Sequence, residues 1–150
     1  MTPTAPGSAD ARPVLTPGMA RTLQPSAAVA FTVLGAALWW SWFAWDTVAG
    51  TDAAGSQTGP YEAWQVAGCV LSWIVLAWLG VRVLRPFLLT AALPVGFTAA
   101  WILTAALHDD SGLWAVGAIL VAGGTLAGNA ALVWVLRALT QRKHPGSAAH

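Results

Sequence analysis

The side chains with the greatest chemical capacity lie in two loops between long apolar stretches. His108, Asp109 and Asp110 follow one another before the last stretch, while Asp46 and Glu62 flank the loop before the second. Imidazole and carboxylate groups brought together would suit a divalent cation or an acid/base pair. Adjacent residues do not all point at one ion, however, and acids at a helix start already complement the helix dipole. We therefore predict no metal site and no catalytic residue, and leave a cation at the outer acids open.

Asn129 is the most polar side chain deep inside an apolar stretch. An amide at such depth most simply forms an interhelical hydrogen bond, and contact with a substrate or ion is the alternative. No charged residue lies within the core of any apolar stretch. Proton-coupled carriers and voltage sensors normally need such buried ionisable groups, so the sequence does not favour these classes.

Other chemistry is also disfavoured. A haem would need an axial His or Met within the apolar stretches, yet His108 lies at a rim and both methionines precede the first stretch. The chain has no nucleophile motif, no phosphate-binding glycine loop and no basic patch of the size that nucleic acid needs. The sequence predicts a protein that is not an enzyme, takes no cofactor and binds no nucleic acid.

The composition indicates which elements would position these residues. The 150 residues are 57% hydrophobic and only 9% charged, whereas soluble proteins have about 25% charged residues. A helix needs about 20 residues to cross about 30 Å of hydrocarbon, and four stretches come near that length, at about residues 27–45, 63–83, 87–107 and 113–136. We predict an all-α polytopic membrane protein with a four-helix transmembrane domain over residues 27–137, between a disordered tail (1–26) and a second tail (138–150).

The first stretch also resembles the apolar core of a secretory signal peptide, because Arg12 and Arg21 precede it. Its length and its aromatic end favour an uncleaved anchor. Further along, Pro60 and Glu62 mark a helix start, and Pro94 removes a backbone donor within the third stretch. A kink is expected there.

Charge segregation predicts the orientation. All seven Lys and Arg lie before the first stretch, in the hinge Arg82–Pro86 or after the fourth stretch, and five of the six acids lie in the two other loops. The positive-inside rule then places both termini and the hinge in the cytoplasm and both loops outside, an N-in/C-in topology.

Ten tryptophans gather mostly toward the outer ends of the stretches. Interfacial anchoring explains any one of them, but Trp39, Trp42 and Phe43 share a helix face and are compatible with a contact surface for a partner or a lipid. The candidate partner or ligand contacts are Trp39, Trp42, Phe43, Tyr61, Glu62, Trp64, Asp109, Asp110, Trp114 and Asn129.

Small residues recur at every fourth position in the stretches. Gly96 and Ala100 are examples in the third stretch, and Gly124 and Gly128 form a GxxxG pair in the fourth. Such rows let helix backbones approach closely. They predict packing within the bundle and leave self-association open.

The strings GPYEAWQVAGCVL (Gly59 to Leu71) and DDSGLWAVGAIL (Asp109 to Leu120) lie in an Ala- and Trp-rich chain with four spans. In these features the chain resembles small four-span integral membrane proteins of GC-rich actinobacteria. The resemblance implies a bacterial inner membrane as the location. It implies no activity and no functional residues.

These patterns together favour a non-enzymatic accessory or scaffold subunit that binds a membrane partner through its aromatic outer face. A small homo-oligomeric channel or transporter, built around the glycine face of the fourth stretch with Asn129 lining a path, is the alternative. An enzyme that uses His108 and the outer acids is a third hypothesis. The lipid bilayer is the one partner that all three require.

Overall fold

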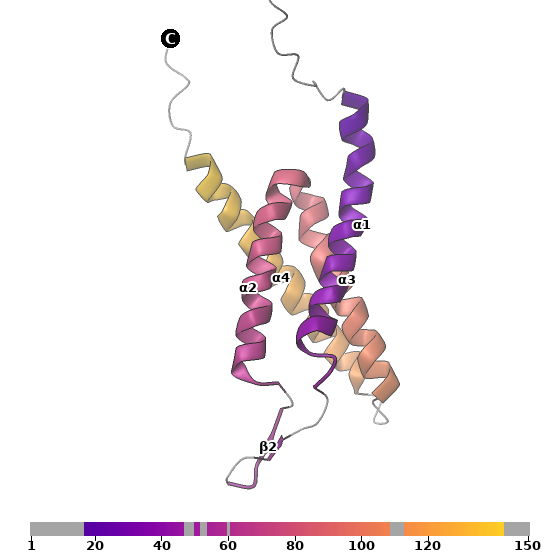
Figure 1. Ribbon diagram of the computed structural model, residues 1–150, viewed down its shortest axis with the longest axis vertical. Coiled ribbons are helices and arrows are strands. Elements are labelled where there is room, and N and C mark those ends of the chain that lie inside the picture. Colours follow the sequence, from indigo (N-terminus) through magenta and orange to yellow (C-terminus); the bar gives the residue numbers. More distant parts are fainter. Residues whose placement is uncertain (1–16, 47–49, 52–53, 60, 109–112, 143–150) are drawn as a thin grey trace, which may run out of the picture.

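The computed structural model describes residues 17–46, 50–51, 54–59, 61–108 and 113–142. The helices in these ranges are α1 (Pro17–Trp42), α2 (Ala63–Val83), α3 (Pro86–His108) and α4 (Trp114–Arg142). All four are long and apolar enough to cross a membrane, and they form one bundle (Figure 1). The predicted all-α class with four transmembrane helices is confirmed. The protein is a multi-pass membrane protein by the length and composition of these helices.

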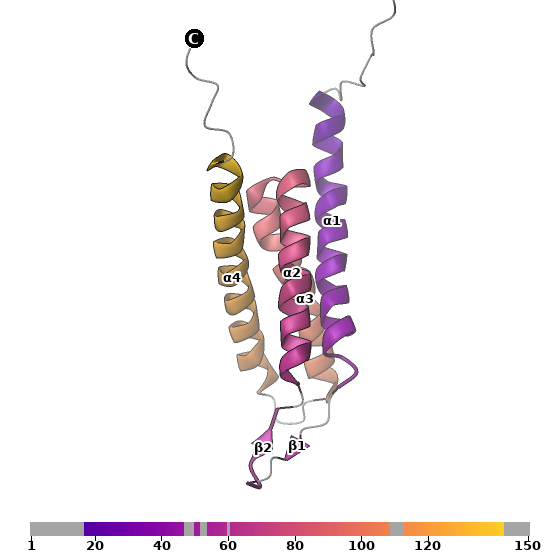
Figure 2. The same ribbon diagram turned by 60° about the vertical axis from the view of Figure 1, so that its left-hand side comes forward.

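The bundle has two distinct ends (Figures 1 and 2). Strands β1 (Gly50–Thr51) and β2 (Gln57–Thr58) pair antiparallel in the loop between α1 and α2, and we call this the hairpin end. The start of α1, the short turn between α2 and α3 and the end of α4 lie at the opposite end, which we call the turn end.

Two helices extend beyond the predicted spans. Helix α1 begins at Pro17, within the segment predicted as a tail, and α4 continues to Arg142. Hydropathy marks only the part of a helix that suits hydrocarbon, so it does not detect a polar continuation. Part of the α1 extension is held by Gln24, whose Nε2 donates to the Val83 carbonyl (2.9 Å) and whose Oε1 accepts from the Arg85 backbone N–H (3.1 Å).

Helix α3 is the centre of the bundle. Its span is 44% buried, against 11% for the span of α4. Helices α1 and α3 approach closely through glycine, because a Cβ added at Gly96 would overlap the Thr32 carbonyl and one at Gly35 would overlap the Leu93 carbonyl. Small residues in α3 therefore do pack within the bundle, as predicted. Helix α4 packs against α3 and α2 and leaves most of its surface to the surroundings.

Candidate functional site

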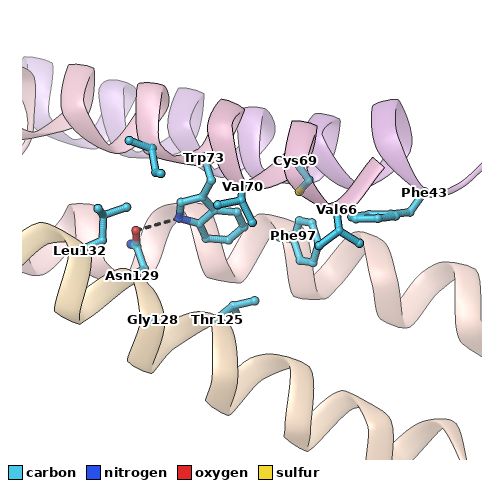
Figure 3. A pocket seen from close by; sticks show the side chains of 11 residues that line it. Phe43, Val66, Cys69, Val70, Trp73, Phe97, Thr125, Gly128, Asn129 and Leu132 are labelled. Carbon is cyan, nitrogen blue, oxygen red and sulfur yellow. Dashed lines mark hydrogen bonds between the residues drawn. The ribbon is translucent and has the colours of Figure 1, made fainter. Parts of the chain in front are cut away.

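The Asn129 side chain joins three helices at the centre of the bundle. It is only 2% exposed. Its Nδ2 donates to the carbonyls of Leu89 (2.9 Å) and Thr90 (3.1 Å) on α3. Its Oδ1 accepts a hydrogen bond from the indole Nε1 of Trp73 on α2 (2.9 Å) (Figure 3). The expected interhelical hydrogen bond is present, and all the polar atoms of this amide are engaged within the chain.

Pro94 explains why the amide lies at this position. In an α-helix the Thr90 carbonyl would accept the N–H of residue 94, and proline has none. Pro94 lies inside α3 and is buried. Asn129 supplies the missing donor from α4. This function of Asn129 is structural.

A cavity of about 350 Å³ lies beside this centre, between α2 and α4. Its wall is apolar apart from Thr125 and the Asn129 amide, and it runs from Phe43 at the hairpin end to Leu132 (Figure 3). The Thr125 hydroxyl donates to the Val121 carbonyl (2.6 Å). Because the polar groups are satisfied internally, the cavity suits an apolar group.

Two of the predicted contact residues belong to the core. Trp39 is 4% exposed and Phe43 is 7% exposed. Their rings pack on each other, on Phe97 of α3 and on Tyr61 in the loop, with centroid distances of 4.8 to 6.3 Å. The Trp39 Nε1 also donates to the Thr104 hydroxyl (2.9 Å). These side chains fix α1 against α3, and Phe43 also borders the cavity between α2 and α4.

Other indoles at the hairpin end are accessible. Trp45 and Trp64 are 59% and 55% exposed, and their ring centroids lie 6.2 Å apart with a 34° angle between the planes. Trp42 meets Trp64 edge-on at 6.2 Å. The Glu62 carboxylate accepts the Trp64 Nε1–H (2.8 Å). We call Trp42, Trp45, Trp64 and Glu62 the indole–carboxylate cluster.

Gln65 is fully buried at the start of α2, and the sequence analysis did not identify it. Its Nε2 donates to the Trp42 carbonyl (3.3 Å) and to the Asp46 carboxylate (3.2 Å), so it joins α1 to α2. Its Oε1 accepts the Glu62 backbone N–H. The spacing from Glu62 to Gln65 is that of a capping pair, in which a residue at the third helical position bonds back to the N-cap. That spacing in the sequence could have identified Gln65 as a residue of this helix cap.

Tyr61 lies close enough to the Asp46 carboxylate to be influenced by its charge. Burial and, to a lesser extent, the negative charge of Asp46 raise the pKa of its hydroxyl above the ordinary value of 10.0. The phenol therefore stays neutral over the physiological pH range and contributes its ring to packing against Phe43. The ring closes the aromatic core at the hairpin end.

The remaining candidates lie around the junction between α3 and α4. Asp109 and Asp110 lie outside the described residues, and Trp114 begins α4. His108 is exposed at the end of α3, where its Nδ1 lies 2.8 Å from the Thr104 carbonyl. Among the described residues no group of three or more His, Cys, Asp or Glu side chains is placed to hold a metal ion.

Three glycines in the middle of α4 differ from the other helical glycines, including Gly117 at the start of the same helix. A Cβ added at Gly68 would overlap the Trp42 ring, and one at Gly117 would come against the Trp101 ring. Added at Gly123, Gly124 or Gly128, it would meet nothing within 4 Å. The GxxxG pair of α4 is therefore not used within the bundle.

A second groove, of about 520 Å³, lies between α1 and α2. It is lined mainly by aliphatic side chains such as Leu34, Leu71 and Val75, and it reaches Ser41 and Trp42 toward the hairpin end. Trp42 therefore belongs both to this groove and to the indole–carboxylate cluster.

Comparisons of the chain with protein-family models, with curated proteins and with solved structures each gave no match.

Proposed function

We propose that the protein is a non-enzymatic membrane subunit that binds a transmembrane helix of a partner protein against α4. One observation carries this proposal: Gly124 and Gly128 lie one helical turn apart with open space where a side chain would begin. Between helices in a bilayer no hydrophobic effect drives association, so close backbone approach at small residues supplies the attraction. A GxxxG pair with nothing packed on it suits such an approach.

The surroundings of the pair also support a helix as the ligand. Gly128 borders the apolar cavity between α2 and α4, so side chains of an adjacent helix would have room beside the glycines. Gly124 and Gly128 are themselves exposed, so an adjacent helix could reach them. We place this subunit in a bacterial inner membrane with both termini in the cytoplasm, as the charge distribution and the resemblance favour.

The aromatic outer face is less suited to a protein partner than the sequence suggested. Trp39 and Phe43 are core residues, so two of the six aromatic side chains among the predicted contacts pack inside the bundle. A channel lined by Asn129 is also disfavoured, because the amide bonds to Trp73, Leu89 and Thr90 inside a single chain. A homo-oligomer formed through α4 would lack that polar path.

Native mass spectrometry of the affinity-purified protein in mild detergent tests the proposal. We expect a heterologous membrane protein at fixed stoichiometry, and we expect it to be lost from the double variant Gly124→Ile, Gly128→Ile. Gly123→Ile is the matched control, because Gly123 is equally open but lies about 100° around the helix from Gly124.

A complex that survives the double variant would refute docking at the glycine pair. A discrete homo-oligomer without another protein would refute the accessory subunit and favour self-assembly. Equal loss of the complex in Gly123→Ile would show that bulk anywhere on α4 is disruptive, which would also contradict a specific site.

A further inference from the structure

The indole–carboxylate cluster at the hairpin end has the components of a site for an organic cation. Trp45 and Trp64 are more than half exposed, so their ring faces are accessible. The Glu62 carboxylate is held at the edge of the Trp64 ring by the bond from Nε1. Indole faces attract ammonium groups through the ring quadrupole, and the attraction grows when the site is partly desolvated.

Among the residues that the structure describes, no Lys or Arg side chain lies at the hairpin end. The sequence has no Lys or Arg between Thr22 and Val81. Asp46 directly follows Trp45 in the chain, and the Glu62 carboxylate accepts the Trp64 Nε1–H. The turn end differs, because there the Arg82 guanidinium lies 3.6 Å from the centroid of the Trp78 ring. The indole at the turn end of α2 is thus paired with an internal cation, whereas Trp64 at the hairpin end is paired with the Glu62 carboxylate.

The groove between α1 and α2 indicates what carries the cation. It reaches the cluster at Trp42 and continues along α1 to Leu34, a distance of about 12 Å at 1.5 Å per residue. Both helices are membrane-span candidates, so the groove opens to hydrocarbon. A ligand that follows this path has a positive group at the membrane surface and an apolar chain below it.

We infer that the hairpin end binds one phospholipid with an ammonium headgroup. The ammonium lies against Trp45, Trp64 and Glu62, and an acyl chain occupies the groove between α1 and α2. A basic peptide or a free cation would satisfy the cluster alone and would leave the groove unexplained. This site is on α1 and α2, so it is separate from the helix-docking surface proposed on α4.

Lipid retention tests the site. The full chain is reconstituted in nanodiscs of equimolar phosphatidylcholine and phosphatidylglycerol, and native mass spectrometry then identifies the lipid that each protein retains. We expect phosphatidylcholine to be retained preferentially. Trp64→Leu and Glu62→Gln should each reduce that preference about fivefold, which corresponds to about 1 kcal/mol.

Two further variants separate this site from general anchoring. Trp134→Leu removes an indole that is 73% exposed on α4 and should leave the preference unchanged. Val75→Trp, which fills the groove at a residue 55% exposed, should reduce retention of the lipid.

Equal retention of the two lipids by the native chain would overturn the inference, and so would an unchanged preference in Trp64→Leu. Unchanged retention in Val75→Trp would refute the acyl-chain part. Complete displacement of the lipid by soluble choline would assign the site to a free cation instead. Trp64 and Val75 are both largely exposed, so these variants should retain the fold, which the helical circular dichroism signal checks.

Discussion

Asn129 and Pro94 act as one structural unit although they lie on different helices. Proline leaves the Thr90 carbonyl without its helical donor, and the Asn129 amide donates to that carbonyl and to the one beside it. An unpaired carbonyl surrounded by hydrocarbon is unfavourable, because hydrocarbon offers no hydrogen-bond donor. The pair lets α3 contain proline without that cost, and it fixes α4 in register against α3.

We therefore expect Asn129→Leu to destabilise the bundle by about 1–2 kcal/mol, given three interhelical hydrogen bonds of about 0.6 kcal/mol each. Pro94→Ala restores a backbone donor for Thr90, so the cost of Asn129→Leu should be smaller in that background. Reversible unfolding in mixed micelles, followed by circular dichroism, gives the four free energies of this double-mutant cycle.

Ala130→Leu is the control for the added apolar bulk, since Ala130 is the exposed neighbour of Asn129. It should not change the free energy of unfolding in either background. Costs of Asn129→Leu that are equal with and without Pro94 would show that the amide is not linked to the proline, and the structural unit described above would not exist.

Among the elements, the helices were predictable and their inward faces were not. Continuous apolar length identified all four spans, and the start of α2 at Ala63 agrees with the predicted start. Hydrophobicity could not tell that Trp39 is buried while Trp40 is 49% exposed, because lipid tails and the bundle interior are equally apolar. The inward position of the polar residue Gln65 could have been predicted, because its spacing from Glu62 is that of a capping pair.

The close contact between α1 and α3 leads to a prediction about two glycines. Gly96→Ala should destabilise the protein by about 1–3 kcal/mol, the range for an overpacked interior, because the new methyl would overlap the Thr32 carbonyl and backbone cannot rotate away as a side chain does. Gly123→Ala should be neutral or slightly stabilising, since its Cβ meets nothing and alanine is the better helix former.

Denaturant unfolding of the two variants provides the comparison. The same residue change is made in two membrane helices, so a difference in the free energy of unfolding reports the packing and not the helix propensity. If Gly96→Ala were as stable as Gly123→Ala, the backbones of α1 and α3 would not be in direct contact at Gly96.

At the scale of the whole molecule, the start of α1, the turn between α2 and α3 and the end of α4 lie together at the turn end (Figure 2). Arg82 and Arg85 flank that turn and Arg137 is near the end of α4, whereas Asp46 and Glu62 lie at the hairpin end. The segregation seen in the sequence is thus a segregation between two ends of one bundle. A bundle with this charge distribution should insert with its turn end in the cytoplasm.

We expect cysteine labelling of intact cells to show this orientation. The native Cys69 is buried in α2 and would be replaced by Ala, after which Gly59→Cys marks the hairpin end and Gln141→Cys marks the turn end; both positions are exposed. A membrane-impermeant maleimide should label the first variant in intact cells and the second only after permeabilisation. The reverse labelling pattern would contradict the predicted topology. It would also place the indole–carboxylate cluster, and the lipid proposed to bind there, in the cytoplasmic leaflet.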